Sequence, residues 1–557
     1  MDKDIESTGT DFIREAVAKD LKEGRYEYIR TRLPPEPNGY LHIGHVKAFM
    51  IDYLIAQENG GELILRFDDT NPAKEESEFV DAIMEDAAWM GIRWVKVTYA
   101  SDYFGELYEW AKKLVRDGKA YVDDQTPEEV SKNRGTLTSP GFNSPYRDRS
   151  VNENLDLLEK MKNGEFPDGS RILRAKIDMT HPNMVMRDPA MYRIIHEPPH
   201  HRTGRDWCIY PLYDWSHGQN DSMERITHSL CSMEYEIHRP LYEWFLAQLG
   251  EFQPRQLEFS RLNLTYAMMS KRKLRKLVEK GLVKGWDDPR LTTLRGMRRR
   301  GYPSEAIATF IKKVGIAKTP SWIEFSLLES CVRDELNKRS LRKMAVVDPI
   351  KVIIDNYPEG LHEELSAINN PEDPAAGNRS VQFGRELYIE REDFEENPPP
   401  KYYRLYPGNE VRLRYAYYVK CVGFEKDHQG KVTTIHCEYD PATRGGDSPD
   451  GRKVKSTIHW VSADNALNAT ILDYGHLFLV ENPDDTEELE AIIDPNSLII
   501  RENAKIEASL SEARPGDQFQ FERLGYYCVD RDSKKDQLIF NRTVTLKDSW
   551  AKIQNRK

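Results

Sequence analysis

The sequence lacks the features that would place a chain in a membrane or outside the cell. It contains no run of about eighteen apolar residues, the length that a membrane-spanning helix needs. Residues 1–10 are acidic and polar, unlike a secretory signal peptide. The six cysteines are scattered without a Cys-x-x-Cys pair, which argues against a zinc site or a disulfide framework. We therefore expect a cytoplasmic protein with reduced thiols and no bound metal.

The chain also lacks an overall positive charge. Its formal net charge is −12 at pH 7, which argues weakly against a nucleic-acid partner. The charge is unevenly spread, however, because residues 271–300 hold twelve Lys or Arg and only three acids. A solvated helix face usually mixes both signs, so we interpret this basic segment as one that contacts phosphates.

At 557 residues the chain exceeds one hydrophobic core, and its N-terminal part has the pattern of a parallel α/β sheet. Residues 26–33 and 62–67 predict strands, and apolar residues at helical spacing from Ile43 to Leu54 predict a helix between them. Ligands of such a βαβ unit bind beyond the carboxyl ends of the strands. The loop 34–39 and Asp68 would lie at that edge.

The rest of the chain is helical first and then rich in short strands. Helical spacing dominates residues 271–344. Segments with alternating or β-branched residues follow, at 410–420, 431–439, 456–461, 497–501, 518–529 and 537–546. Short strands at this spacing indicate a barrel or a sandwich. We expect an all-β C-terminal region that is separate from the α/β front.

Two short motifs carry the candidate chemistry. His42-Ile43-Gly44-His45 opens the first predicted helix, where free N–H groups and the helix dipole attract phosphate. On a helix the two imidazoles share a face, and both can donate to oxygens that gain charge as a phosphorus atom is attacked. Met269-Ser270-Lys271-Arg272 is a basic turn whose lysine can pair with departing pyrophosphate.

These two motifs, in this order, resemble the signature motifs of class I aminoacyl-tRNA synthetases. The similarity to the glutaminyl-tRNA synthetase family then extends over nearly the whole chain, through residues 31–45, 65–72, 143–155, 173–179, 207–214, 226–231, 259–264, 269–273, 285–290 and 540–552. The stretches LRFDDTNP, WCIYPLYD and FNRTVTLKDSWAK are examples. Many long matches in one order make the resemblance specific.

The resemblance implies an α/β plus all-β architecture. It predicts a Rossmann-like catalytic domain in residues 1–115 and 212–270, an inserted acceptor-stem-binding domain in 116–211, a helical subdomain in 271–341, and two β-barrel anticodon-binding domains in 342–557. It also implies a reaction in two steps, in which glutamine and ATP form glutaminyl-adenylate and the terminal adenosine of tRNA(Gln) then takes the acyl group.

Residue by residue, the resemblance implies an ATP site in which His42, His45 and Lys271 act in catalysis. The ATP-binding residues would be Glu36, Pro37, Asn38, His42, Ile43, Gly44, His45, Val46, Lys47, Ala48, Ser232, Arg261, Leu262, Met269, Ser270 and Lys271. Chemistry of this kind depends on positioning and electrostatics, so we expect no protein nucleophile. Mg²⁺ is expected to accompany the ATP, without a dedicated protein cage.

The resemblance implies that Asp68 binds the α-ammonium group of glutamine and Tyr213 its side-chain amide, while Arg32, His217 and Gln256 shape the pocket. Glutamate would need a cation, and the glutamyl family carries an arginine at the position of Cys231. Here the thiol is neutral, so a buried carboxylate would cost several kcal/mol. A Tyr213 hydroxyl held by its neighbours so that it accepts would favour the amide.

For tRNA, the resemblance makes Leu137 an apolar wedge that opens the first acceptor base pair, in a turn rich in Gly and Pro. Arg412 and Arg414 would share one strand face at a spacing of two residues. The positions that match anticodon contacts are Arg342, Arg404, Arg412, Arg414, Gln520 and Arg523, and guanidinium groups suit splayed single-stranded bases.

The sequence departs from the family at two positions and leaves two alternatives open. Ile237 replaces an aspartate that reads an acceptor-stem guanine in several relatives, and Tyr403 replaces a lysine found in some. The alternatives are a glutamyl-tRNA synthetase with a β-barrel anticodon domain and a catalytically silent tRNA-binding relative. The neutral Cys231 disfavours the first and the two intact motifs disfavour the second. With no obvious dimer helix, we expect a monomer.

Overall fold

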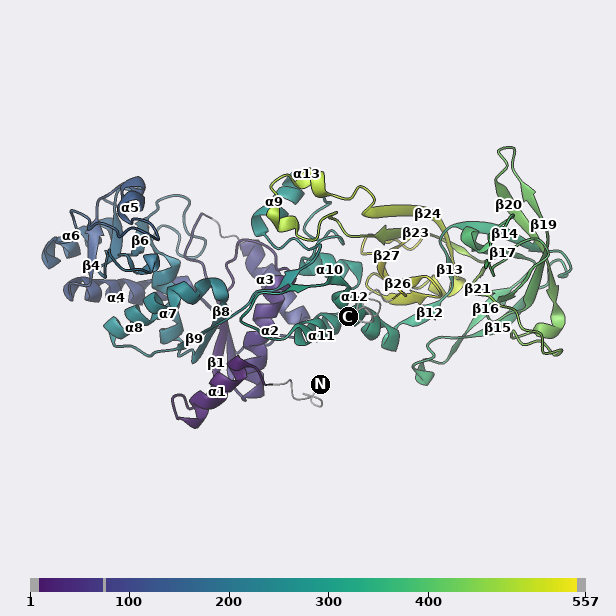
Figure 1. The fold of residues 1–557 in the computed structure, drawn as a ribbon, viewed down its shortest axis with the longest axis horizontal. Coiled ribbons are helices and arrows are strands. Elements are labelled where there is room, and N and C mark those ends of the chain that lie inside the picture. Colours follow the sequence, from purple (N-terminus) through teal and green to yellow (C-terminus); the bar gives the residue numbers. More distant parts are fainter. Residues whose placement is uncertain (1–9, 74–76, 548–557) are drawn as a thin grey trace. The chain divides into compact units, whose positions relative to one another are not determined.

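The computed structural model describes residues 10–73 and 77–547 (Figure 1). The chain divides into two compact units, residues 1–263 with 311–322 and residues 264–310 with 323–557. Within the described residues, no helix has both the length and the apolar character needed to cross a bilayer. All six cysteines, which lie in the described part, are free thiols.

The first unit is built on parallel strands. β1 (Arg30–Leu33), β2 (Glu62–Phe67) and β3 (Lys96–Tyr99) form one parallel sheet, and β8 (His228–Ser232) pairs in parallel with β9 (Arg255–Phe259). Hydrogen bonds join the two groups, because the Thr227 N–H donates to the Arg30 carbonyl at 2.9 Å. α2 (Ile43–Glu58) connects β1 to β2, which confirms the predicted βαβ unit.

The first predicted strand is too long, because residues 26–29 lie outside β1. Tyr26 is buried through its ring and donates its hydroxyl to the Gln253 carbonyl at 2.8 Å. Its aromatic character therefore reflects side-chain packing and not a backbone ladder. The remaining helices of this layer are α1 (Phe12–Lys22), α3 (Ser77–Trp89) and the 3₁₀ turn η1 (Ala100–Tyr103).

An antiparallel sheet interrupts the parallel one. It runs in the order β4 (Ala120–Asp123), β5 (Ile172–Ala175), β6 (Ala190–Ile194) and β7 (Ile209–Pro211). The helices beside it are α4 (Phe104–Arg116), α5 (Pro127–Asn133), α6 (Val151–Lys162), α7 (Tyr213–Met223) and α8 (Arg239–Leu249), with η2 (Met184–Met186) and η3 (Met233–His238). One apolar core that includes Leu158, Tyr192, Trp215 and Phe245 joins this region to α7 and α8.

The second unit begins with helices. They are α9 (Lys271–Glu279), α10 (Leu294–Arg300), α11 (Ser304–Val314), which continues past residue 310, and α12 (Phe325–Arg339). The short strands β10 (Asn263–Leu264) and β11 (Trp322–Ile323) lie where the chain passes from one unit to the other. The predicted helical region ends earlier than residue 344, because β12 (Leu341–Lys343) begins directly after α12.

Two seven-stranded sheets follow, and the ends of each are close in sequence. One runs β12, β25 (Gln518–Phe521), β26 (Gly525–Val529), β27 (Leu538–Thr545), β23 (Leu467–Tyr474), β24 (Leu498–Ile506) and β13 (Ala345–Val346). The other runs β21 (Thr457–Ile458), β18 (Glu410–Leu413), β19 (Tyr418–Lys426), β20 (Val432–Asp440), β14 (Pro349–Ile354), β17 (Glu386–Glu390) and β22 (Val461–Ser462).

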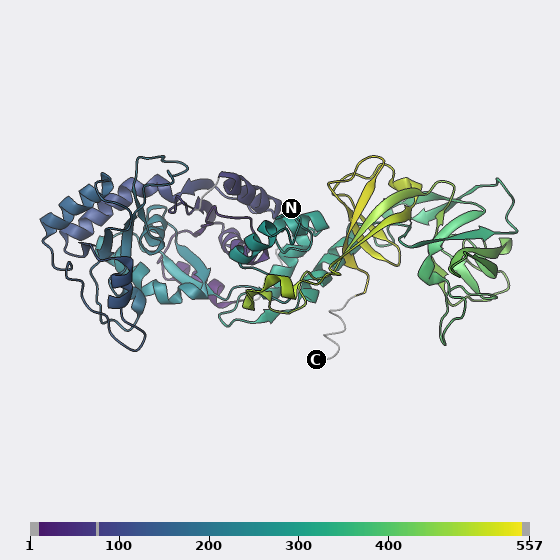
Figure 2. The same ribbon diagram turned by 90° about the horizontal axis from the view of Figure 1, so that it is seen from above.

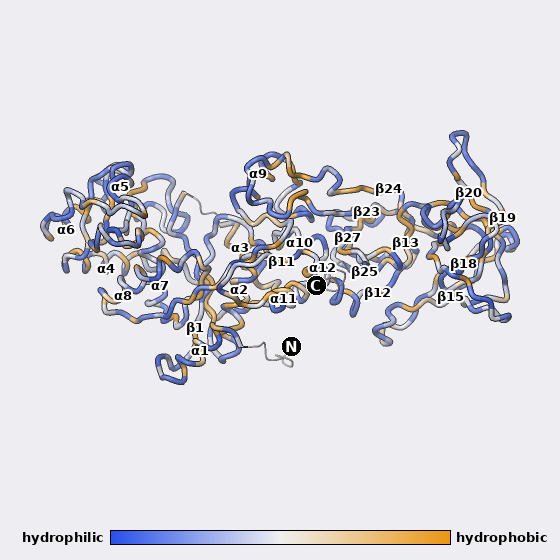
Figure 3. Tube along the Cα trace, viewed as in Figure 1, coloured by the Kyte–Doolittle hydropathy of each residue, from blue (hydrophilic) through white to orange (hydrophobic). Residues whose placement is uncertain are grey.

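Short chain segments join the two edges of each sheet, Met344 in the first and His459-Trp460 in the second. The edges must therefore lie side by side, so each sheet curls into a barrel, as expected (Figure 2). Each barrel has an apolar interior, around Phe521 and Phe540 in one and Phe383 and Trp460 in the other. The hairpin tip between β19 and β20 is hydrophilic (Figure 3).

The smaller elements of the second unit are a two-stranded hairpin and short helical turns. The hairpin is β15 (Glu363–Ile368) with β16 (Asn378–Phe383), and α13 is Leu489–Ile492. The 3₁₀ turns are Pro374–Ala376, Arg391–Asp393, Pro441–Thr443, Pro483–Asp485 and Ala508–Leu510. Leu274 and Leu277 of α9 pack with Leu489 of α13 in one apolar cluster.

Candidate active site and nucleic-acid interface

The two histidines of the HIGH motif cap the helix that they begin. His42 is the N-cap of α2, so it precedes the helix instead of sharing a helical face with His45 as predicted. Its Nδ1 accepts from the Gly44 N–H at 3.1 Å, and Nδ1 of His45 accepts from the His42 N–H at 3.1 Å. Each neutral ring therefore carries its proton on Nε2, and Nε2–H is the donor that it can offer to an anionic oxygen.

The other predicted ATP residues of the first unit differ in exposure and in their partners. Glu36 is exposed and accepts from the Asn38 side chain in the loop after β1, and Arg261 is exposed. Ser232, at the end of β8, donates to Glu234 at 2.8 Å. Lys47 instead points inward, where its Nζ donates to the Ser260 carbonyl at 2.7 Å and burial lowers its pKa to about 8.

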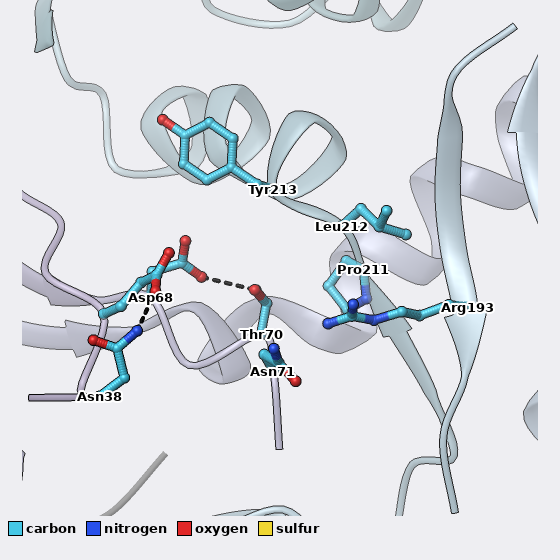
Figure 4. Close-up of a pocket in the computed structure, with 9 residues that line it drawn as sticks. Asn38, Asp68, Thr70, Asn71, Arg193, Pro211, Leu212 and Tyr213 are labelled. Carbon is cyan, nitrogen blue, oxygen red and sulfur yellow. Dashed lines mark hydrogen bonds between the residues drawn. The ribbon is translucent and has the colours of Figure 1, made fainter. Parts of the chain in front are cut away.

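A cavity of about 240 Å³ opens at the carboxyl end of β2. It is lined by Glu36, Asn38, Asp68, Thr70, Asn71, Arg193, Pro211, Leu212 and Tyr213. Asp68 accepts a hydrogen bond from Thr70 at 2.9 Å, and burial raises its pKa to about 6. The Tyr213 hydroxyl points away from Arg193 (Figure 4). The structure thus brings Asp68 and Tyr213 together, with an acid available for an ammonium group.

Beneath Tyr213 lies a buried ionic network with balanced charge. The Tyr213 ring stacks on His217, with 4.7 Å between centroids, and Nε2 of His217 accepts from Arg32 at 2.8 Å. Burial lowers the pKa of His217 to about 3, so the ring is neutral. Arg32 and Arg66 both pair with Asp221, and Arg66 also pairs with Glu224 at 2.6 Å. Two guanidinium groups therefore face two carboxylates.

The network consumes the donors of Arg32. Its guanidinium is fully buried and also donates to the Leu230 carbonyl at 3.0 Å and to Ser229 at 2.6 Å.

We predicted that neighbours hold the Tyr213 hydroxyl by hydrogen bonds, and that expectation is not met in the described residues. The Tyr213 ring instead stacks on His217 and packs at a tilt against Tyr235.

Cys231 and Gln256 lie on β8 and β9, beside this network. Burial raises the pKa of the Cys231 thiol, which keeps the group neutral. Gln256 is buried and donates to the Tyr235 carbonyl at 3.3 Å and to Glu258 at 3.0 Å. Neither residue lines the cavity. Both side chains are uncharged, and the prediction that they belong to the glutamine site is not tested by this lining.

The MSKR turn belongs to the second unit, where a loop far along the chain holds it. The N–H groups of Met269 and Ser270 donate to the Asp484 carboxylate at 3.1 and 3.3 Å. Ser270 is the N-cap of α9, so Lys271 is the first residue of that helix. Lys273 donates to the Thr486 carbonyl at 2.7 Å.

Several cations of the basic segment 271–300 are paired within the second unit. Acidic residues from later in the chain pair with several of its cations, as Glu487 does with Arg272 and Asp530 does with Arg299 at 2.9 Å. Arg300 is buried and donates to backbone carbonyls. The interpretation of the segment as one that contacts phosphates remains a prediction, and the sequence pattern omits the distant acids that pair with these cations.

Leu137 is displayed at the tip of an ordered turn. Its side chain is 83% exposed. Arg187, which is buried, donates to the carbonyls of Arg134, Thr136 and Ser139 at 2.8, 2.9 and 3.0 Å. A blade held at its base in this way is suited to entering a base stack.

The predicted anticodon residues form two clusters in the second unit. In one, Arg523 and Arg404 both pair with the buried Asp393, and Arg414 pairs with Glu522, the residue before Arg523. In the other, Arg342 lies opposite Gln520 in the β12–β25 ladder. Arg342 is buried and bonded to Asn337, which also accepts from Tyr526.

Arg412 stands apart from both clusters, since it donates to the Gly445 carbonyl at 3.0 Å. It does not share a strand with Arg414, because β18 ends at Leu413 and a turn with Tyr415 at φ 66° follows. The predicted strand 410–420 was therefore too long, and the prediction that Arg412 and Arg414 share one strand face is wrong.

The two departures from the family lie on the surface. Ile237 is 57% exposed, and its carbonyl accepts from Asn183 at 2.7 Å. Tyr403 is exposed, with the Lys455 ammonium 4.7 Å from its ring centroid. A lysine thus stands beside Tyr403, where some relatives carry the lysine itself.

Five lining residues, Thr70, Asn71, Arg193, Pro211 and Leu212, were not among the predicted site residues. Thr70 and Asn71 lie within the matched stretch LRFDDTNP, and Pro211 and Leu212 lie within WCIYPLYD, so the signal for these four was present and unused. Arg193 lies in β6 without any neighbouring motif, and only the fold brings it to the cavity.

Comparisons with known proteins agree with this arrangement. Residues 28–338 match the family model described as tRNA synthetases class I (E and Q), catalytic domain, and residues 340–440 and 457–530 match two models of the anti-codon binding domain. A glutamine--tRNA ligase of Bradyrhizobium diazoefficiens is 56% identical over 98% of this chain and 98% of its own. Those of Clostridium perfringens and Vibrio campbellii are each 52% identical, over 97% and 98% of this chain and 98% and 99% of their own.

Proposed function

The chain belongs to the class I (E and Q) tRNA synthetases, and on that premise we propose that it attaches L-glutamine to tRNA(Gln) at the expense of ATP. Full-length relatives with more than half of their residues identical carry the name glutamine--tRNA ligase. The glutamyl alternative is disfavoured by these names, and the silent relative by the intact motifs.

The reaction has two steps. In the first, a carboxylate oxygen of glutamine attacks the α-phosphorus of ATP, the bond to the β-phosphate oxygen breaks, and pyrophosphate leaves. Nε2–H of His42 and His45 would donate to the phosphate oxygens, and Lys271 would pair with the departing pyrophosphate. In the second, a ribose hydroxyl of the terminal adenosine attacks the acyl carbon, its proton is lost, and AMP leaves. Mg²⁺ would accompany ATP as part of the substrate.

The choice of glutamine rests on one observation, the balanced charge beneath Tyr213. Arg32 and Arg66 are matched by Asp221 and Glu224, and His217 is neutral. A glutamate carboxylate beside Tyr213 would find no cation that is not already paired in this network. Asp68 lies in the same cavity and would bind the ammonium group that both amino acids share.

Arg193 lines the cavity but does not reverse this choice. The Tyr213 hydroxyl points away from it (Figure 4), so an amide at the hydroxyl would not meet the guanidinium. Arg193 would instead lie on the side of the cavity away from the amide. We therefore assign the side-chain amide of glutamine to the Tyr213 hydroxyl, where the Arg193 guanidinium does not reach it.

For tRNA, we assign Leu137 to the acceptor end, and the two clusters together with Arg412 to the anticodon. The acids that pair with Arg404, Arg414 and Arg523 would fix their planes before RNA arrives, which reduces the entropy lost on binding. We further propose that the protein acts as a monomer in the cytoplasm.

An aminoacylation assay with purified protein tests the function. Glutamine, ATP and tRNA(Gln) should give charged tRNA, AMP and pyrophosphate, and Lys271→Ala should reduce the rate by at least about a hundredfold. Absence of charging by the native protein, or an unchanged rate in the variant, would contradict the proposal.

A further inference from the structure

A group of polar side chains joins the two walls of the amino-acid cavity from behind. One wall is the end of β2 with Asp68 and Thr70, and the other is formed by Arg193 of β6 and residues 211–213. Asp69 lies between Asp68 and Thr70 but is fully buried on the opposite side of the chain. His200 and His201 belong to the connection between β6 and β7.

Asp69 is held through both its side chain and its main chain. Its carboxylate accepts from the Ser101 N–H at 2.8 Å, from the Ser101 hydroxyl at 2.6 Å and from Nε2 of His201 at 3.1 Å. Its carbonyl accepts from Nε2 of His200 at 2.7 Å. Because of these four hydrogen bonds, the backbone of Asp69, which links Asp68 to Thr70, cannot rotate without breaking several of them.

A second layer covers this clasp, which consists of Asp69, Ser101, His200 and His201. Arg202 donates to the Ser101 hydroxyl at 2.8 Å and to Asp102 at 2.6 Å, and its guanidinium lies 3.9 Å from the Tyr99 ring centroid. The connection 195–208 is thus fixed to the segment that follows β3 as well as to the end of β2.

The same atoms could be considered a metal site, since ligand atoms of Asp69, His200 and His201 lie within 4.8 Å of one another. The hydrogen bonds argue against it. Nδ1 of His200 accepts from the N–H groups of Arg202 and Thr203 at 3.2 and 3.1 Å, so its proton is on Nε2, the atom that faces Asp69. A cation there would have to displace that proton and would meet Arg202 nearby.

We propose that Asp69, His200 and His201 are positioning residues for the amino-acid site, which orient Asp68 and Thr70 toward glutamine by locking the β6–β7 connection to the end of β2. The inference rests on the proposed function. It makes the inserted antiparallel sheet a structural partner of the ammonium-binding carboxylate, so that the two walls of the cavity move as one.

The test is steady-state aminoacylation with three variants. His201→Leu should lower kcat/KM for glutamine by at least about tenfold, mainly through KM. The reason is that loosening Asp69 displaces the neighbouring Asp68 carboxylate from the ammonium group of glutamine. The KM for ATP should stay within about twofold. His201→Gln, whose amide can donate to Asp69, should recover most of the loss. Asp69→Asn should be the most impaired, by about a hundredfold.

His196→Gln is the matched control. His196 lies in the same β6–β7 connection, but it pairs on the surface with Asp168 and not with Asp69. It should leave glutamine kinetics within about twofold of the native protein. Thermal unfolding of each variant checks that it is folded, and His201→Leu keeps the test valid if Asp69→Asn does not fold.

The proposal is overturned if folded His201→Leu retains native glutamine kinetics, or if its KM for ATP rises as much as its KM for glutamine. It is also overturned if purified protein holds one equivalent of Zn²⁺ that Asp69→Asn loses. Failure of the native protein to charge glutamine would overturn both this inference and the proposed function, whereas native charging with an unaffected variant overturns the inference alone.

Discussion

The amino-acid cavity and the anticodon face both depend on arginine–carboxylate pairs, but they use them at different depths. Arg32 and Arg66 are buried, with Asp221 fully inaccessible between them. Arg404 and Arg414 are 37% and 42% exposed, although the acids that hold them are buried. Beneath the amino-acid cavity, the pairs leave no unbalanced charge. On the anticodon face, they present oriented positive charge to solvent.

This difference teaches what each region can recognise. We call the balanced network of Arg32, Arg66, Asp221 and Glu224 the neutral floor of the cavity. It offers no free cation to the side-chain carboxylate of glutamate, and leaving that charge unpaired in a low dielectric is costly. A half-exposed guanidinium with a fixed plane keeps the edges that bind a splayed base. Each of the following experiments breaks or sharpens that contrast.

The largest effect is expected from Asp221→Asn. The substitution leaves Arg32 and Arg66 with one carboxylate fewer in a fully buried place, which should lower the free energy of unfolding by about 3–5 kcal/mol. Urea denaturation measures this change. Asp168→Asn, which breaks an exposed pair with His196, is the control and should cost less than about 1 kcal/mol. Equal costs for the two variants would show that depth does not matter here.

Tyr213→Phe should weaken the reading of the amide without disturbing the ring stack on His217. We expect kcat/KM for glutamine to fall about 10- to 100-fold, since one hydrogen bond to the substrate is lost. Glutamate should lose less, so the ratio of the two kcat/KM values should narrow. A proportional loss for both amino acids would place the hydroxyl outside the amide's reach.

The pH profile of glutamine use should follow Asp68. Burial, with help from the nearby Glu36 and Asp69 and against Arg66 and the Thr70 hydrogen bond, raises its pKa to about 6. Only the carboxylate binds an ammonium group, so kcat/KM should be constant above this pH. Below it, the value should fall about tenfold per pH unit. An acidic limb that persists in Asp68→Asn would assign the titration to another group.

The smallest effect is expected on the anticodon face. Arg412→Ala should raise the KM for tRNA by about tenfold and leave the KM for glutamine within about twofold, since the Arg412 guanidinium donates to the Gly445 carbonyl and makes no ion pair within the described residues. Arg444→Ala removes another surface arginine, paired with Glu363 at 3.0 Å, and should change neither constant. A rise in the glutamine KM with Arg412→Ala would contradict the assignment.

Local patterns predicted the local elements well. The βαβ unit, the helix after the HIGH motif and the C-terminal strands follow from periodicity that neighbours in sequence control. The errors lie at element ends, as at residues 26–29 and Arg414, where side-chain packing or a turn replaces the ladder. Strand spacing indicated a barrel or a sandwich, the family resemblance predicted barrels, and the short chain between the edges of each sheet explains why the sheets close.

The site was predictable only in part, because its charges are balanced across long stretches of sequence. Asp221 meets Arg32 across 189 residues, and Glu487 meets Arg272 across 215. No spacing rule reaches so far, which is why the acidic partners of the basic segment could not be predicted. The βαβ pattern placed Asp68 at the ligand-binding edge, the family resemblance supplied its role and Tyr213, and Arg193 depends on the fold alone.

The central claim is that a neutral floor beneath Tyr213 selects an amide over a carboxylate, and the most direct test compares glutamine and glutamate on tRNA(Gln) with the native protein. We predict a kcat/KM ratio of at least about 10⁴ in favour of glutamine, the discrimination typical of a site built around a buried polar contact. A glutamate value within tenfold of the glutamine value would contradict the claim.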